Sequence, residues 1–259
     1  MRIADRYDCF LLDLDGVLFR DDEPVPRAAE TMETLRSAGK RLAFVTNNSA
    51  RTPSEVADML IGFGIRAAPD EVETSALATA DLLAERGVRS AFIVGEQGIR
   101  EALGGVGIEV VEEDAGYVDA VVVGLDRSAT YGKLRAACLL VERGATLIAT
   151  NGDPSYPAPD GRWPGAGALL AIVTTTTGAT PEVVGKPNPP LFLAARDRAG
   201  GGNPLVVGDR LETDIAGASA LGWDSFLVLS GIAGRGDLDR SSVQPTYVAN
   251  DISALLSDT

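Results

Sequence analysis

Residues 10–19 have the sequence FLLDLDGVLF, in which an apolar run ends in two aspartates separated by one leucine. Residues 10–12 are typical of the end of a buried parallel strand. At such an end Asp13 and Asp15 repel each other and lose solvation, which costs a few kcal/mol unless a cation or hydrogen bonds compensate. Two aspartates in a solvent-exposed loop would show the same short pattern, so the rest of the chain has to decide.

Beyond this stretch, short apolar segments alternate with amphipathic segments along the chain. The alternation predicts an α/β fold with a three-layer, doubly wound and mostly parallel sheet. Strands are expected at 8–14, 41–46, 204–209 and 224–231, and helices at 27–38, 214–221 and 251–256. The Pro/Gly-rich stretch 154–167 is expected to form a loop.

The acidic composition, with a formal net charge of −14, argues against a broad surface for nucleic acid or for an anionic membrane. No run approaches the roughly 18 apolar residues of a membrane span, and the first residues lack the pattern of a secretory signal. Cys9 and Cys138 lie in a predicted strand and a predicted helix, which indicates buried thiols in a reducing compartment. We therefore expect a cytoplasmic protein.

The chain contains no histidine. This excludes Ser-His-Asp hydrolases, Cys-His proteases and His-ligated zinc sites. Catalysis has to rely on carboxylates, hydroxyls, Lys, Arg, backbone amides or a metal held by oxygen. Lysine is scarce, with only Lys40, Lys133 and Lys186, so each lysine needs an explanation.

Polar residues cluster at the ends of four predicted strands: DLDG (13–16), TNN (46–48), GKPNP (185–189) and GDRLETD (208–214). In a doubly wound parallel sheet the carboxyl ends of the strands open onto one crevice, where ligands bind. Each cluster alone has an ordinary structural explanation, such as a turn or a helix start. Together, and in this order, they predict a site for phosphoryl transfer.

The residue types suit that chemistry. Asp13, Asp15 and Asp209 offer hard oxygen ligands for Mg²⁺. Asp13, kept ionised by the cation, can attack phosphorus and form an aspartyl-phosphate. Asp15 can protonate the leaving alkoxide and then deprotonate the hydrolytic water. Lys186 supplies a compact positive charge to the phosphate and the nucleophile.

Further donors are expected around the phosphate. Gly16 allows a sharp turn that brings backbone amides close to the phosphoryl oxygens. The Thr46 hydroxyl and the amides of Asn47 and Asn48 lead toward a helix start and add donors. Asp214, at a helix start, is expected to orient a metal-bound water or Lys186.

The four clusters resemble, in order, the four motifs of the haloacid dehalogenase superfamily of phosphatases. VVVGLDRSATYGKL (121–134) and ATNGDPSYPAPDGRWPGAG (149–167) resemble the cap of its class IIA branch, the 4-nitrophenylphosphatase, phosphoglycolate phosphatase and NagD-like proteins. The resemblance implies Asp13 as nucleophile, Asp15 as acid and base, and Thr46, Asn47 and Lys186 around the phosphate. It also implies Mg²⁺ held by the Asp13 side chain, the Asp15 carbonyl and Asp209.

A second domain is expected because Thr46 and Lys186 are 140 residues apart (186 − 46), whereas a βαβ crossover needs about 30 residues. We expect a discontinuous core, 1–78 and 179–259, and an inserted α/β cap of C2 type, 79–178. A cap excludes water and contacts the leaving group. Its candidate substrate residues are Asn151, Asp153, Tyr156, Arg162 and Trp163. Caps of this branch often supply a dimer surface, which leaves a homodimer open.

These observations predict a Mg²⁺-dependent phosphatase acting on a small-molecule phosphate ester. A phosphotransferase or phosphomutase on the same core remains an alternative, since only the acceptor differs from water. A phospho-accepting receiver domain is a rival of another class, but it is about half as long and orders its motifs differently. A dehalogenase would leave Asp15 without a role. A dinucleotide-binding enzyme would need a stronger glycine motif than GEQG (95–98).

Overall fold

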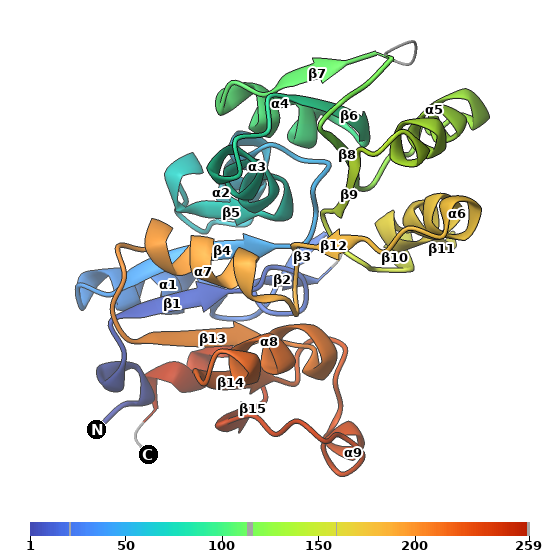
Figure 1. Cartoon of the computed structure of the whole chain (residues 1–259). Helices are drawn as coiled ribbons and strands as arrows, with labels where there is room; N and C mark the ends of the chain where they lie inside the picture. Colours follow the sequence, from blue (N-terminus) through green and yellow to red (C-terminus); the bar gives the residue numbers. More distant parts are fainter. Residues whose placement is uncertain (21, 113–115, 159, 258–259) are drawn as a thin grey trace. The chain divides into compact units, whose positions relative to one another are not determined.

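The computed structural model describes residues 1–20, 22–112, 116–158 and 160–257. Its internal contacts divide the chain into two compact units, each interrupted in sequence. The core unit comprises Met1–Thr46, Pro53–Glu73 and Lys186–Thr259, and the inserted unit comprises Asn47–Thr52 and Thr74–Gly185. Figure 1 shows the elements of both units.

The core unit is built on a six-stranded sheet with the order β15-β14-β13-β1-β4-β5. β1 pairs in parallel with both β13 and β4, β13 pairs in parallel with β14, and β14 with β15. The strands are β1 (Cys9–Leu12), β4 (Arg41–Thr46), β5 (Val72–Thr74), β13 (Pro204–Gly208), β14 (Asp224–Val228) and β15 (Tyr247–Ala249).

Helices cover both faces of this sheet, because its central strands are buried on both faces. On one face Phe10, Phe44 and Phe226 form a core with side chains of α1 (Ala28–Ser37) and α2 (Pro53–Gly62). On the other face α7 (Pro189–Arg198) packs on β1 and β4, and α8 (Ala216–Ala220) packs on β14. The predicted three-layer, doubly wound α/β class is confirmed.

Shorter elements complete the core unit. β2 and β3 pair as a small antiparallel hairpin, and several short helical turns lie between the larger elements and near the ends of the chain. These elements are β2 (Phe19–Arg20), β3 (Glu23–Pro24), α9 (Arg235–Leu238), the 3₁₀ turns η1 (Ile3–Arg6), η2 (Pro69–Glu71) and η4 (Ile252–Leu256), and the π-turn η3 (Leu211–Ile215).

The inserted unit has its own five-stranded parallel sheet, with the order β12-β9-β8-β6-β7. The strands are β6 (Ser90–Val94), β7 (Glu109–Val111), β8 (Ala120–Val123), β9 (Thr146–Ala149) and β12 (Glu182–Val183). The helices are α3 (Ser75–Glu85), α4 (Gln97–Gly105), α5 (Tyr131–Glu142) and α6 (Ala166–Thr177). The contact division differs from the predicted boundaries at 79 and 178, because α3 packs against α4 and β12 pairs with β9.

Several predicted elements need correction. Residues 154–167 do not form a plain loop, because β10 (Ser155–Ala158) and β11 (Gly161–Pro164) pair as an antiparallel hairpin; residue 159 lies outside the described residues. The helix predicted at 214–221 begins earlier, as η3, and continues as α8. The helix predicted at 251–256 is a 3₁₀ turn, and the strand predicted at 224–231 ends at Val228.

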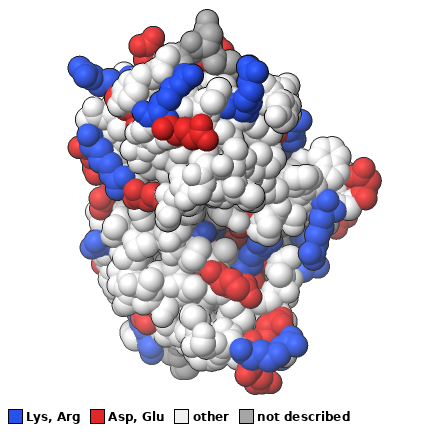
Figure 2. Space-filling model, turned by 45° about the vertical axis from the view of Figure 1, so that its right-hand side comes forward, with Lys and Arg blue, Asp and Glu red and all other residues white. Residues whose placement is uncertain are grey.

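On the face shown in Figure 2, basic and acidic side chains lie interspersed. Within the described part of the chain, no helix combines the length and apolar character needed to cross a membrane. Cys9 in β1 and Cys138 in α5 are buried free thiols, as the sequence predicts.

Candidate active site

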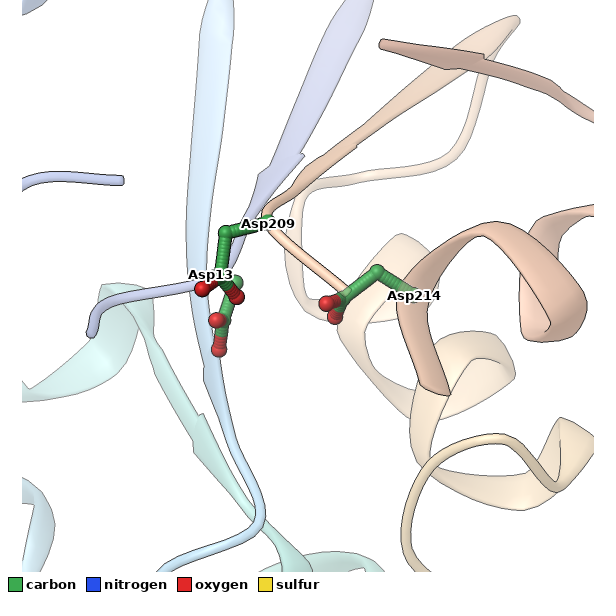
Figure 3. Close-up of side chains that lie close together, drawn as sticks. All are labelled: Asp13, Asp209 and Asp214. Carbon is green, nitrogen blue, oxygen red and sulfur yellow. The ribbon is translucent and has the colours of Figure 1, made fainter. Parts of the chain in front are cut away.

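Three carboxylates meet at the carboxyl end of the core sheet. Asp13, Asp209 and Asp214 each offer an oxygen, and these three atoms lie within 4.8 Å of one another. Figure 3 shows the three side chains converging, with Asp214 on its own turn of helix. Asp13 follows β1 and Asp209 follows β13, and the parallel pairing of these strands brings the two ends together.

Lys186 is the cation of this cluster, and it is only 5% exposed. Its Nζ donates to Asp13 Oδ1 at 2.5 Å and to Asp214 Oδ1 at 2.8 Å. Burial by itself lowers the pKa of Lys186, but the two carboxylates outweigh burial and hold that pKa above its usual range. The ammonium therefore stays charged and bridges two acids that lie 201 residues apart (214 − 13) in sequence.

The electrostatics leave the cluster short of positive charge. Burial raises the pKa of Asp13 well above its usual range despite the opposing effect of Lys186. Burial also raises the pKa of Asp209 to about 6, and the charge of Asp214 adds to this effect. Three ionised carboxylates and one ammonium sum to −2 (−3 + 1). An all-oxygen donor set with this charge fits a hard divalent cation such as Mg²⁺.

The turn after β1 is shaped by Gly16. Its φ is +78°, and a Cβ there would lie 2.5 Å from Asp209 Oδ2, so both the backbone and the available space require glycine. Gly16 N donates to Phe19 O at 2.7 Å, which closes the turn. Asp15 stands in this turn with an exposed side chain. This exposure is compatible with proton exchange with a substrate or with water.

The TNN segment is divided between the two units. Thr46 is the last residue of β4 and is buried, whereas Asn47 begins the segment Asn47–Thr52 of the inserted unit. Within the inserted unit, Asn47 O accepts hydrogen bonds from Ser75 Oγ and from Asn151 Nδ2, both at 2.7 Å. Asn47 Nδ2 donates to Asp153 Oδ2 at 3.2 Å. The structure thus brings Asn47, Asn151 and Asp153 together.

The remaining predicted residues have different surroundings. Asn48 Oδ1 accepts from Ala50 N at 3.0 Å, which caps the turn after the TNN segment. Tyr156 lies opposite Trp163 in the β10–β11 hairpin, with ring centroids 6.0 Å apart in an edge-to-face arrangement. The Tyr156 hydroxyl is buried and has no hydrogen-bond partner among the residues that the structure describes. Arg162 and Trp163 are exposed.

Sequence reasoning missed one segment that contacts this site, the loop that follows β14. Ser230 Oγ donates to Gly16 O at 2.6 Å, and Ile232 N donates to Asp209 Oδ2 at 2.7 Å. The predicted strand at 224–231 includes Ser230 and ends just before Ile232, whereas the strand of the structure stops at Val228. The Ser-Gly pair at 230–231, which follows the apolar run 226–229, was the available signal.

Comparison with known proteins gives consistent matches over the whole chain. A model of the haloacid dehalogenase-like hydrolase family matches residues 10–109, and a HAD-hydrolase-like model matches residues 183–255. A 5′-nucleotidase of Bacillus subtilis is 38% identical over 250 residues, which cover 95% of this chain and 96% of that protein. An acid sugar phosphatase of Staphylococcus aureus is 36% identical, with 98% of each chain covered.

Solved structures match equally well. A glycerol phosphate phosphatase of Mycobacterium tuberculosis, crystallised with magnesium and also with calcium, has a TM-score of 0.94 and 38% identity. In the magnesium complex the match covers all of this chain and 79% of that one. A 4-nitrophenylphosphatase of Thermotoga maritima has a TM-score of 0.92 and 32% identity, with 100% and 99% of the two chains covered.

Proposed function

The chain belongs to the family of haloacid dehalogenase-like hydrolases, and from this premise we propose that it is a magnesium-dependent phosphatase using an aspartyl-phosphate on Asp13. The family membership confirms the resemblance predicted from the four motifs. The names of the relatives, phosphatases and a nucleotidase, confirm the expected class, a hydrolase of phosphoric monoesters. The metal and the covalent intermediate belong to the proposal.

In the first step of the proposed reaction, a carboxylate oxygen of Asp13 attacks phosphorus. The bond between phosphorus and the ester oxygen breaks, and Asp15 gives its proton to the departing alkoxide. In the second step Asp15 takes a proton from water, whose oxygen attacks phosphorus and releases Asp13 and inorganic phosphate. Asp15 is thereby reprotonated, so the cycle closes without another reactant.

The surrounding groups hold charge in place during both steps. Lys186 keeps Asp13 oriented through its 2.5 Å contact and offers positive charge to the phosphoryl oxygens. Gly16, Thr46, Asn47 and Asn48 would supply amide and hydroxyl donors to the same oxygens. The Asp13 and Asp209 side chains and the Asp15 carbonyl would hold Mg²⁺, which would supply positive charge to offset the developing negative charge.

The inserted unit is proposed to act as the cap of this enzyme. Asn151, Asp153 and Tyr156 are the residues that we expect to influence substrate choice, and a homodimer formed through this unit remains a prediction. The relatives are named for nucleotides, acid sugar phosphates, glycerol phosphate and 4-nitrophenyl phosphate. A screen of these ester classes by kcat/KM would identify the preferred substrate.

A single observation supports the proposal most strongly. It is the partly buried Asp13 carboxylate, which pairs with buried Lys186 and lies close to the buried carboxylates of Asp209 and Asp214 at the end of a parallel sheet. Such an arrangement costs stability unless it serves a cation and an anionic substrate. Three of the four charged groups are buried, which is hard to explain by a structural role alone.

The test is hydrolysis of 4-nitrophenyl phosphate by the purified full chain. Asp13→Asn should lower kcat at least about 10³-fold, because it removes the nucleophile, and EDTA should abolish wild-type turnover until Mg²⁺ is restored. Asp197→Asn, which changes an exposed aspartate of α7, is the matched control and should keep wild-type turnover. Retained metal-dependent turnover in Asp13→Asn would refute the assignment.

A further inference from the structure

The loop after β14 has no role in the mechanism above, yet its backbone donates a hydrogen bond to Asp209, a predicted metal ligand. We propose that Ser230 and Gly231 are positioning residues, which hold Asp209 and the Gly16 turn in the arrangement that binds the divalent cation. The inference rests on the proposed function, because it takes Asp209 as a ligand of that cation. The loop is a fifth segment at a strand end, in addition to the four polar clusters found in the sequence.

Backbone amides of the loop donate hydrogen bonds to both the side chain and the backbone of Asp209. Ile232 N donates to Asp209 Oδ2 at 2.7 Å, and Ala233 N donates to Asp209 O at 3.0 Å. β14 pairs with β13 in the register Gly208↔Leu227, so the two strands end side by side and the loop reaches Asp209 directly. The carboxylate is therefore fixed at one oxygen, which determines where the other oxygen can point.

Gly231 makes this approach possible. Its φ lies outside the left-handed region, so its backbone does not require glycine, but a Cβ there would lie 2.0 Å from Asp209 Oδ2 and 2.4 Å from Asp209 Cβ. Gly16, in the turn after β1, lies close to the same oxygen. A Cβ on Gly16 would lie 2.5 Å from Asp209 Oδ2 and 2.8 Å from Gly231 Cα. Asp209 thus lies between two residues without side chains.

Ser230 connects the loop that contains Gly231 to the turn that contains Gly16. Its hydroxyl donates to Gly16 O at 2.6 Å, across 214 residues of sequence. This bond fixes the turn that carries Asp15, whose carbonyl is a predicted ligand, against the loop that fixes Asp209. Groups that orient metal ligands in this way typically change metal affinity about 10–100-fold when they are removed.

The experiment measures metal binding rather than turnover. Gly231→Ala and Ser230→Ala are compared with wild type by calorimetric titration of the full chain with Mg²⁺, without substrate. Gly236→Ala is the matched control, because it adds the same methyl group in α9, where the Cβ would meet no described atom within 4 Å apart from its chain neighbours and its own helix backbone. Thermal unfolding in EDTA reports the stability of each variant without metal.

We expect Gly231→Ala to weaken Mg²⁺ binding about 10–100-fold and Ser230→Ala to weaken it by a smaller factor. Gly236→Ala should bind like wild type. Turnover of both loop variants should recover at high Mg²⁺, which a general loss of structure would not allow. Ser230→Ala removes only one hydrogen bond, so it tests the inference even if Gly231→Ala does not fold.

Two results would overturn the inference. Mg²⁺ affinities of Gly231→Ala and Ser230→Ala equal to that of Gly236→Ala would show that the loop does not position the ligand. Weakened binding that does not recover in turnover at high Mg²⁺, together with a lowered metal-free melting temperature, would show a structural role only. A wild-type protein that binds no Mg²⁺ would instead refute the proposed function.

Discussion

Replacing Lys186 by methionine tests the charge balance on which the site depends. The change keeps the length of the side chain and removes an ammonium that contacts carboxylates at 2.5 Å and 2.8 Å. Removing one partner of a buried ion pair costs roughly 3–5 kcal/mol, because the remaining charges are left uncompensated. For a chain of this size about 1 kcal/mol shifts Tm by about 2–4 °C, so we expect a decrease of roughly 6–20 °C in EDTA.

Magnesium should reverse part of this loss. Without the ammonium the three carboxylates sum to −3 instead of −2, so a divalent cation gains more by binding to the variant. The increase in Tm caused by Mg²⁺ should therefore be larger in Lys186→Met than in wild type. Turnover should nevertheless be low, because the variant lacks the charge that acts on the phosphoryl group.

A double-mutant cycle makes the test specific. Lys186→Met combined with Asp214→Asn removes one charge of each sign and restores the sum of −2. The free energy of unfolding lost in the double variant should be smaller, by about 0.5–3 kcal/mol, than the sum of the losses in the two single variants. A Trp163→Phe background removes the tryptophan of the inserted unit and leaves Trp223, in the core unit, as the single tryptophan of the chain, so its fluorescence follows the core unit alone.

Two results would refute this reasoning. If the free energies of unfolding lost in the two single variants add up, within about 0.5 kcal/mol, to the loss in the double variant, Lys186 and Asp214 do not interact energetically. An equal Mg²⁺-induced rise in Tm for wild type and Lys186→Met would show that the cation does not respond to the charge of the cluster. Either result would remove the electrostatic basis of the predicted metal site.

Two further predictions concern the stability of the two units away from the carboxylate cluster. Arg127 donates hydrogen bonds to Glu96 from its side chain and its backbone, and this lowers the pKa of Glu96. A lowered folded-state pKa stabilises the protein above the unfolded value of about 4.5, and the contribution is lost as the pH falls through the folded value. Glu96→Gln should therefore cost about 1 kcal/mol near neutral pH and little in acid, as urea unfolding at several pH values would show; a cost independent of pH would contradict it. Gly217→Ala should destabilise by about 1–3 kcal/mol, because its Cβ would lie 2.1 Å from Phe192 Cε2. Gly104→Ala, where nothing lies within 4 Å, should stabilise by about 0.5–1 kcal/mol, and equal effects of the two alanines in urea unfolding would contradict the packing argument.

The sequence predicts the core sheet well, because its strands leave a strong pattern. β1 and β13 are buried on both faces, so each is a short apolar run that stops at a polar residue. The rule that parallel strands end at one edge then brings Asp13 and Asp209 together without any structural knowledge. The same rule does not place Lys186, because the strand before it, β12, belongs to the sheet of the inserted unit. Its ion pairs with Asp13 and Asp214 join it to the cluster.

Other features leave no pattern in sequence. The π-turn η3 carries Asp214 to the cluster one turn before α8, and a helix pattern alone does not distinguish the two. Gly231 follows an apolar run as many turn glycines do, and the atom that fills the place of its side chain, Asp209 Oδ2, lies 22 residues away (231 − 209). The assignment of Asn47–Thr52 to the inserted unit also depends on long-range contacts with Asn151 and Ser75.

The three lysines show why the site uses an ammonium where the chain otherwise uses arginine. Lys40 Nζ donates to Tyr7 O at 2.7 Å, and Lys133 Nζ donates to the fully buried carboxylate of Asp126 at 2.6 Å. Lys186 joins two carboxylates in a space where it is 5% exposed. A guanidinium is planar and its five donors form a rigid fork, whereas an ammonium is compact and can direct its donors to separate acceptors. A single point charge can therefore contact both Asp13 and Asp214.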